Sequence, residues 1–147
     1  MKIMLPVDGS AAALAAVHHA IGLVSSGLQA EFVLANVQEP PSLYEVVVVH
    51  NAAAMDEVRA QAGADLLAPA EAALLAAGLA FEIEVAGGDP GHVLVDLIEN
   101  YNCQAVVMGA RGAGAEMGTG SGGLGTVAQA LLDHSPVPVT VVRLSAD

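Results

Sequence analysis

Hydrophobic and polar residues alternate along the chain in blocks that predict strands and helices in turn. The apolar run 3–7 predicts a short strand, which ends at Asp8-Gly9-Ser10. The Ala-rich stretch 11–24 that follows predicts a helix, and the serine before it is a suitable cap. Residues 30–37 are rich in strand-forming types and stop before two prolines, so they predict a second strand.

The middle of the chain contains one ambiguous segment and two clear ones. Residues 42–54 include four consecutive valines between a proline break and a helix, so a strand and an ordered loop both remain open. Residues 55–77 have helical spacing, and Gly63 and especially Pro69 inside this stretch predict a bend or a break. Residues 80–86 alternate apolar and acidic side chains, which predicts a strand at a sheet edge.

The C-terminal part continues the same alternation. Asp89-Pro90 is a typical helix start and precedes a predicted helix at 92–100. An apolar strand at 104–108, a helix at 127–133 and a last strand at 138–142 follow. Strands and helices that alternate in this way predict an α/β fold, a doubly wound parallel sheet with helices on both faces. We expect a single domain over residues 1–147, because the chain has the usual length of one.

Composition excludes several classes of partner. The formal net charge of −12 repels nucleic acid and anionic lipid surfaces. The sequence contains no apolar run long enough to span a membrane and no signal peptide, so we expect a cytoplasmic protein. Cys103 is the only cysteine, which excludes an intrachain disulfide and favours a buried apolar residue.

Candidate ligand-binding residues follow the predicted strands. In a doubly wound sheet, ligands bind beyond the carboxyl ends of the strands, where the strand order reverses. Here those positions are Asp8-Gly9-Ser10, Val37, residues 87–89 and the segment that starts at Gly109. We therefore expect any small-molecule site to be formed by these segments.

The segment from Gly109 to Thr126 contains half of the 16 glycines of the protein. Such a glycine-rich stretch before a helix allows backbone amides and the helix dipole to bind a phosphate. A linker in which glycine supplies only flexibility is the alternative. The Walker motif is absent, since Lys2 is the only lysine, and the dinucleotide-binding motif is absent after the first strand.

Several segments carry a resemblance to a known family. They are Val7-Asp8-Gly9-Ser10 after the first strand, residues 106–112 after the fourth, and Gly125-Thr126 leading to residues 134–139. With these motifs the chain resembles universal stress proteins from end to end. The resemblance implies a five-stranded parallel sheet in the order 3-2-1-4-5, usually in a homodimer. It also implies a regulatory module of the stress response.

The same resemblance implies an adenine nucleotide, ATP or AMP, with or without Mg²⁺. One branch of the family binds ATP through Gly-x-x-Gly, a nine-residue spacer and Gly-Ser/Thr, whose fixed positions match Gly109, Gly112, Gly125 and Thr126. By this match Asp8 would lie near the ribose or phosphates, and the backbone of Val37 would meet the adenine. No catalytic residue and no metal site is predicted. The predicted binding residues are Pro6, Val7, Asp8, Ser10, Val37, Met108, Gly109, Arg111, Gly112, Gly125 and Thr126.

The chain departs from the family pattern in the spacer, residues 113–124, which is three residues longer and contains Glu116. Closing pairs at Gly118-Thr119 or Gly120-Ser121 are alternatives, but only Gly125-Thr126 directly precedes a predicted helix. This departure motivates a second hypothesis, a dimeric scaffold that has lost the nucleotide and uses the loop as a protein-contact surface. Under either hypothesis we expect a homodimer through the strand from Pro138 to Val142, because an uncovered edge tends to pair with another copy.

Overall fold

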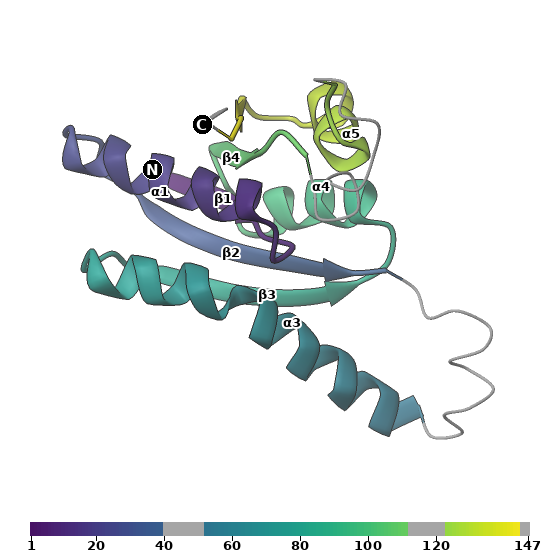
Figure 1. Cartoon of the computed structure of the whole chain (residues 1–147). Helices are drawn as coiled ribbons and strands as arrows, with labels where there is room; N and C mark the ends of the chain where they lie inside the picture. The colour runs from purple at the N-terminus through teal and green to yellow at the C-terminus, as the bar shows by residue number, and fades with distance from the viewer. Residues whose placement is uncertain (40–51, 112–122, 145–147) are drawn as a thin grey trace.

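The computed structural model describes residues 1–39, 52–111 and 123–144, with side chains of the second range described from residue 55 onward. A five-stranded sheet in the order β3-β2-β1-β4-β5 forms its centre (Figure 1). The strands are β1 (Lys2–Pro6), β2 (Glu31–Gln38), β3 (Phe81–Gly87), β4 (Ala105–Gly109) and β5 (Val139–Val142). The helices are α1 (Ala11–Ser25), α3 (Ala52–Ala76), α4 (Pro90–Asn100) and α5 (Thr126–His134).

All neighbouring strands pair in parallel, which confirms the predicted sheet and its order. Strand β3 lies at one edge, as its alternating pattern predicted, and pairs with β2 along its whole length. Parallel pairing brings the carboxyl ends of all strands to the same side of the sheet. Among the described residues no helix is long and apolar enough to cross a membrane.

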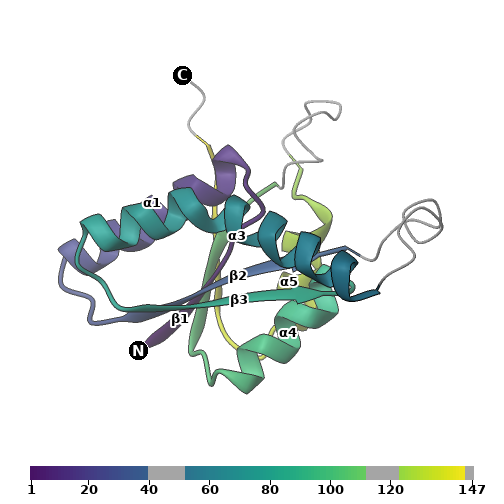
Figure 2. The ribbon, with the colours of Figure 1, turned by 90° about the horizontal axis from the view of Figure 1, so that it is seen from below.

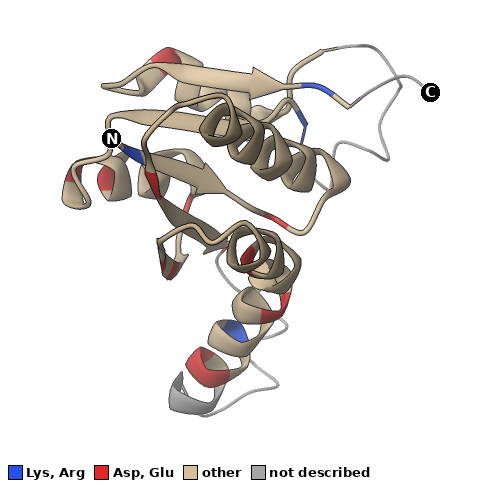
Figure 3. Cartoon of the chain, turned by 90° about the vertical axis from the view of Figure 1, so that its left-hand side faces the viewer, with Lys and Arg blue, Asp and Glu red and all other residues tan. Residues whose placement is uncertain are grey.

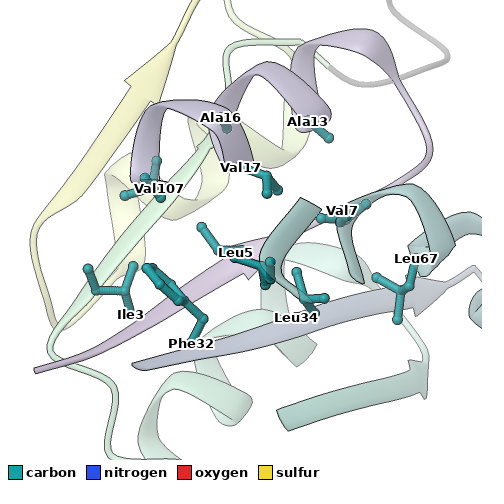
Figure 4. Packing of buried hydrophobic residues seen from close by; sticks show 13 residues of the cluster. Ile3, Leu5, Val7, Ala13, Ala16, Val17, Phe32, Leu34, Leu67 and Val107 are labelled. Atoms are coloured by element: carbon teal, nitrogen blue, oxygen red, sulfur yellow. The ribbon is translucent and has the colours of Figure 1, made fainter. Parts of the chain in front are cut away.

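Helices cover both faces of the sheet, with α1 and α3 on one side of β2 and β3 and α4 on the other (Figure 2). Alternate residues of each strand face opposite sides, so Phe32 and Leu34 pack with α1 and α3 (Figure 4), while Val33 packs with α4 and α5. A second hydrophobic core lies between the sheet and helices α4 and α5, and it contains Cys103. Cys103 is 5% exposed, and burial raises the pKa of its thiol. The prediction of a buried cysteine is therefore confirmed.

Helix α3 begins three residues earlier than predicted and contains the predicted bend. It begins at Ala52, so part of the ambiguous segment 42–54 is helical, and residues 40–51 lie outside the described residues. Pro69 lies inside the helix without ending it, and Figures 1 and 2 both show the helix axis changing direction. Proline removes one helical hydrogen bond and clashes with the preceding turn, so a bend is the expected result.

Local caps determine where two helices start. Ser10 has an extended backbone before α1, and its hydroxyl accepts a hydrogen bond from the N–H of Ala13 at 3.1 Å. The Asp89 carboxylate does the same for α4, accepting from the N–H of His92 at 3.2 Å. Both helix starts were predicted from these residue types. They place the N-terminal turns of α1 and α4 beyond the carboxyl ends of β1 and β3.

Candidate functional site

A cavity of about 580 Å³ opens at the carboxyl ends of the central strands, next to the N-terminal turns of α1, α4 and α5. Every predicted binding residue that the structure describes lines it, and Gly112 lies outside the described residues. The predicted residues on its wall are Pro6, Val7, Asp8, Ser10, Val37, Met108, Gly109, Arg111, Gly125 and Thr126. A volume of this size is typical of sites for small ligands and cofactors.

The buried side chain of Asn36 and the partly buried side chain of Gln38 support the end of β1, which forms one part of the cavity wall. The N–H of Val7 donates to the carbonyl of Ala35 at 2.8 Å. The Val7 carbonyl accepts from the side-chain amide of Asn36 at 2.8 Å, and Asn36 is 2% exposed. Gln38 in turn donates its side-chain amide to Asn36 at 2.6 Å. These bonds hold the end of β1 against β2, which continues beyond it paired only with β3.

The backbone of Val37 faces the space beyond the end of β1. In β2 the odd-numbered residues bond toward β1, as Glu31 does with Met1 and Ala35 with Val7. Even-numbered residues bond toward β3, as Gln38 does with Gly88. By the same alternation the N–H and C=O of Val37 point past the end of β1, on the side of the cavity. One donor and one acceptor are thus presented side by side to a ligand.

The turn between β1 and α1 uses its polar groups internally as well as lining the cavity. Asp8 accepts a hydrogen bond from the N–H of Ser10 at 2.9 Å, although its side chain is exposed. Gly9 has φ +86°, and a Cβ there would lie 2.5 Å from Leu66 of α3. The positive φ favours glycine at this turn, whereas the terminal methyl group of Leu66 belongs to a flexible side chain that can shift. Asp8 and Ser10 shape the turn whether or not a ligand is bound.

Two backbone hydrogen bonds of Ala110, on the opposite wall of the cavity, join the end of β4 to β5 and to the start of α5. The N–H of Ala110 donates to the carbonyl of Val142 at 2.9 Å, and its carbonyl accepts from the N–H of Gly125 at 2.8 Å. Gly125 is the N-cap of α5 and supplies no side-chain cap, so the first N–H groups of α5 are not capped by it. Such groups and the helix dipole attract an anion. Together these contacts hold the start of α5 against the end of β4.

Several lining residues were not predicted from the sequence. Pro90 and Leu94 come from α4, and Ala128 comes from α5, so they add an apolar wall. Glu39, just after β2, adds a second acidic residue besides Asp8. No residue of the candidate segment 87–89 lines the cavity. Asp89 caps α4 instead, and the next residue, Pro90, lies on the cavity wall. In the sequence, Pro90 at the start of the helix after the third strand was the only sign that this helix would reach the cavity.

Comparison with known proteins decides the family. The sequence model of the universal stress protein family matches residues 1–143. The chain belongs to this family. None of the curated proteins compared with the chain matches it significantly.

Solved structures of universal stress proteins have the same fold. UspA from Lactobacillus plantarum is 24% identical, with a TM-score of 0.69 over 97% of each chain. A universal stress protein in complex with cAMP is 22% identical, with a TM-score of 0.69 over 99% of this chain and 98% of that one. A family member from Arabidopsis thaliana with AMP bound is 19% identical, with a TM-score of 0.69 over 100% and 94%.

Proposed function

We propose that this universal stress protein is a regulatory module that binds an adenine nucleotide in the 580 Å³ cavity. The observation that carries the proposal is the convergence of every described residue of the predicted binding set on this one cavity. Structural relatives with AMP or cAMP bound give independent support for an adenine ligand.

The cavity offers a suitable environment for each part of such a ligand. The N–H and C=O of Val37 provide the donor and acceptor that an adenine edge needs, and Leu94 and Met108 supply apolar contact. Asp8 lines the cavity with an exposed side chain, which supports a role in accepting hydrogen bonds from ribose hydroxyls. The start of α5, with Arg111 nearby, attracts the phosphate.

Thr126 is the residue at which the phosphate position can be tested with little risk to folding. It is exposed and begins α5, where an acidic residue favours the helix. A Thr126→Asp variant would place a negative charge beside the phosphate, and Thr126→Asn is the uncharged control of equal size. We expect Thr126→Asp to weaken AMP binding about ten-fold or more and to leave adenosine binding within about two-fold.

Titration calorimetry with adenosine, AMP, cAMP and ATP, with and without Mg²⁺, makes this test. Saturable binding of AMP that Thr126→Asp weakens and Thr126→Asn retains would support the nucleotide site. Absence of heat with all of these ligands would refute the proposal and favour the dimeric scaffold. Equal losses for adenosine and AMP would place the phosphate elsewhere.

A homodimer through β5 is a further part of this proposal. On its inner side β5 bonds to β4 through Pro138 and Val142, so the backbone groups of Val139 and Val141 face the open edge. An exposed edge with β-branched side chains favours pairing with a second copy. Light scattering after size exclusion is expected to give twice the monomer mass of 14.7 kDa, and a monomer at micromolar concentration would contradict the proposal.

A further inference from the structure

A second cavity, of about 290 Å³, adjoins the nucleotide cavity at the carboxyl ends of β4 and β5. Its lining consists of Ala12, Ala110, Arg111, Arg143 and Leu144. Ala110 and Arg111 also line the nucleotide cavity, so these two residues stand between the two spaces. A ligand that reaches Arg111 from the first cavity is therefore next to the second.

Backbone contacts bring the two arginines together although they are far apart in the sequence. Gly109 pairs with Val142 in the sheet, and the Ala110 N–H donates to the Val142 carbonyl at 2.9 Å. Arg111 and Arg143 directly follow these paired ends. The Ala110 carbonyl also holds Gly125, so the start of α5 lies on the other side of the same residue. The order across this region is α5, Ala110 and then the end of β5.

The charge distribution makes this arrangement significant. The chain has four Lys and Arg residues in all, and two of them line this one cavity. Of the others, Lys2 pairs with Glu82 at 3.1 Å, and Arg59 donates to the carbonyl of Glu39. Figure 3 shows two blue segments near each other beside the C-terminal end of the chain. A protein with net charge −12 thus keeps half of its strongly basic residues at a single cavity.

We propose that this second cavity binds the terminal phosphates of an adenine nucleotide, and that Arg143 determines how strongly the protein prefers a triphosphate to a monophosphate. The inference rests on the proposed function, because the first phosphate must lie at α5 and Arg111. Guanidinium groups bind phosphate oxygens with two parallel hydrogen bonds. Both arginines already make interactions within the chain, and phosphate oxygens would share or replace them.

The test compares the binding of adenosine, AMP and ATP by calorimetry, without Mg²⁺, in the wild-type protein and in Arg143→Met. Arg143 is exposed, and methionine retains the aliphatic part of its side chain, so folding is expected to be preserved. The expected result is a roughly ten-fold loss of ATP affinity, with AMP and adenosine affinities within about two-fold of wild type. Arg143→Lys should recover part of the loss.

Lys2→Met is the matched control, because it removes one positive charge at the opposite end of the sheet, beside Glu82. It should leave the ratio of ATP to AMP affinity unchanged, which separates local binding from the effect of net charge. An Arg143→Met variant that weakens AMP and ATP equally, or neither, would overturn the inference while the nucleotide site stands. If adenosine and AMP do not bind at all, the proposed function itself fails, and this inference with it.

A separate anion could occupy the second cavity instead of the terminal phosphates. Inorganic pyrophosphate added to the AMP-saturated protein distinguishes the two sources. Pyrophosphate binding that requires Arg143, combined with ATP binding that does not, would overturn the proposal in favour of an independent anion. Competition between pyrophosphate and ATP, but not AMP, is the expected result.

Discussion

Gly109 offers the clearest test of the packing that positions the 580 Å³ cavity. It ends β4 against the first turn of α1, and a Cβ built there would lie 2.8 Å from the backbone carbon of Ala12 and 3.0 Å from its oxygen. Real Cβ atoms do not approach a backbone this closely, and a helix backbone cannot rotate away as a side chain can. Gly109→Ala therefore forces α1 away from β4.

The expected cost of this overpacking is about 1–3 kcal/mol in the free energy of unfolding. For a chain of 147 residues, this corresponds to a fall in Tm of roughly 3–10 °C. Urea unfolding followed by circular dichroism measures the free energy, and thermal melting measures the Tm. The displacement of α1 should also weaken AMP binding, because Ala13 of the same helix lines the cavity.

Gly22→Ala is the matched control, since this glycine lies in α1 with no atom within 4 Å of its would-be Cβ. Alanine is favoured over glycine inside a helix, so this variant should be more stable than wild type by about 0.5–1 kcal/mol. A Gly109→Ala protein that is as stable as wild type would refute the argument that this glycine is required by close packing.

Three further predictions concern single side chains. Ser10→Ala should lower the free energy of unfolding by about 1 kcal/mol in urea titrations, because the cap on α1 is lost. Hydrogen bonds from His92 hold the pKa of Asp89 below its ordinary 3.8, so its contribution to stability is present above that pH and is lost as the pH falls through the lower folded value. Asp89→Asn should flatten this part of the acid unfolding profile, and an unchanged profile would contradict the linkage. Cys103, buried and with a raised pKa, should react with a thiol reagent only after unfolding in urea, and rapid labelling of the native protein would show that the second core opens.

Much of this fold follows from local signals. The caps at Ser10 and Asp89 satisfy N–H groups of their own helices, so the helix starts could be predicted without knowing what the helices pack against. The cavity could be predicted for a related reason. Parallel strands place all their carboxyl ends on one side, and residues such as Val7, Val37 and Met108 must therefore converge there.

Features that depend on distant contacts could not be predicted in this way. In the sequence Asn36 is an ordinary residue of a predicted strand. Only the structure shows that its side-chain amide donates to the carbonyl of Val7 at the end of β1. The second cavity depends on the register that aligns Gly109 with Val142, and no periodicity in the sequence fixes this register. The sequence therefore does not assign Arg143 to a site, although the strand before it was correctly predicted.

The hydrogen bond from the Gly125 N–H to the Ala110 carbonyl has a consequence for changes in the length of the chain between these residues. This bond joins the chain just before residues 112–122 to the chain just after them. It holds the end of β4 beside the start of α5, whatever the number of residues between Ala110 and Gly125. For a segment without contacts of its own, lengthening the family's nine-residue spacer to twelve raises the loop-closure cost by only about 0.3 kcal/mol. A peptide tag or reporter group that makes no contacts of its own, inserted between the two bonded residues, is therefore expected to change the free energy of unfolding by only a few tenths of a kcal/mol.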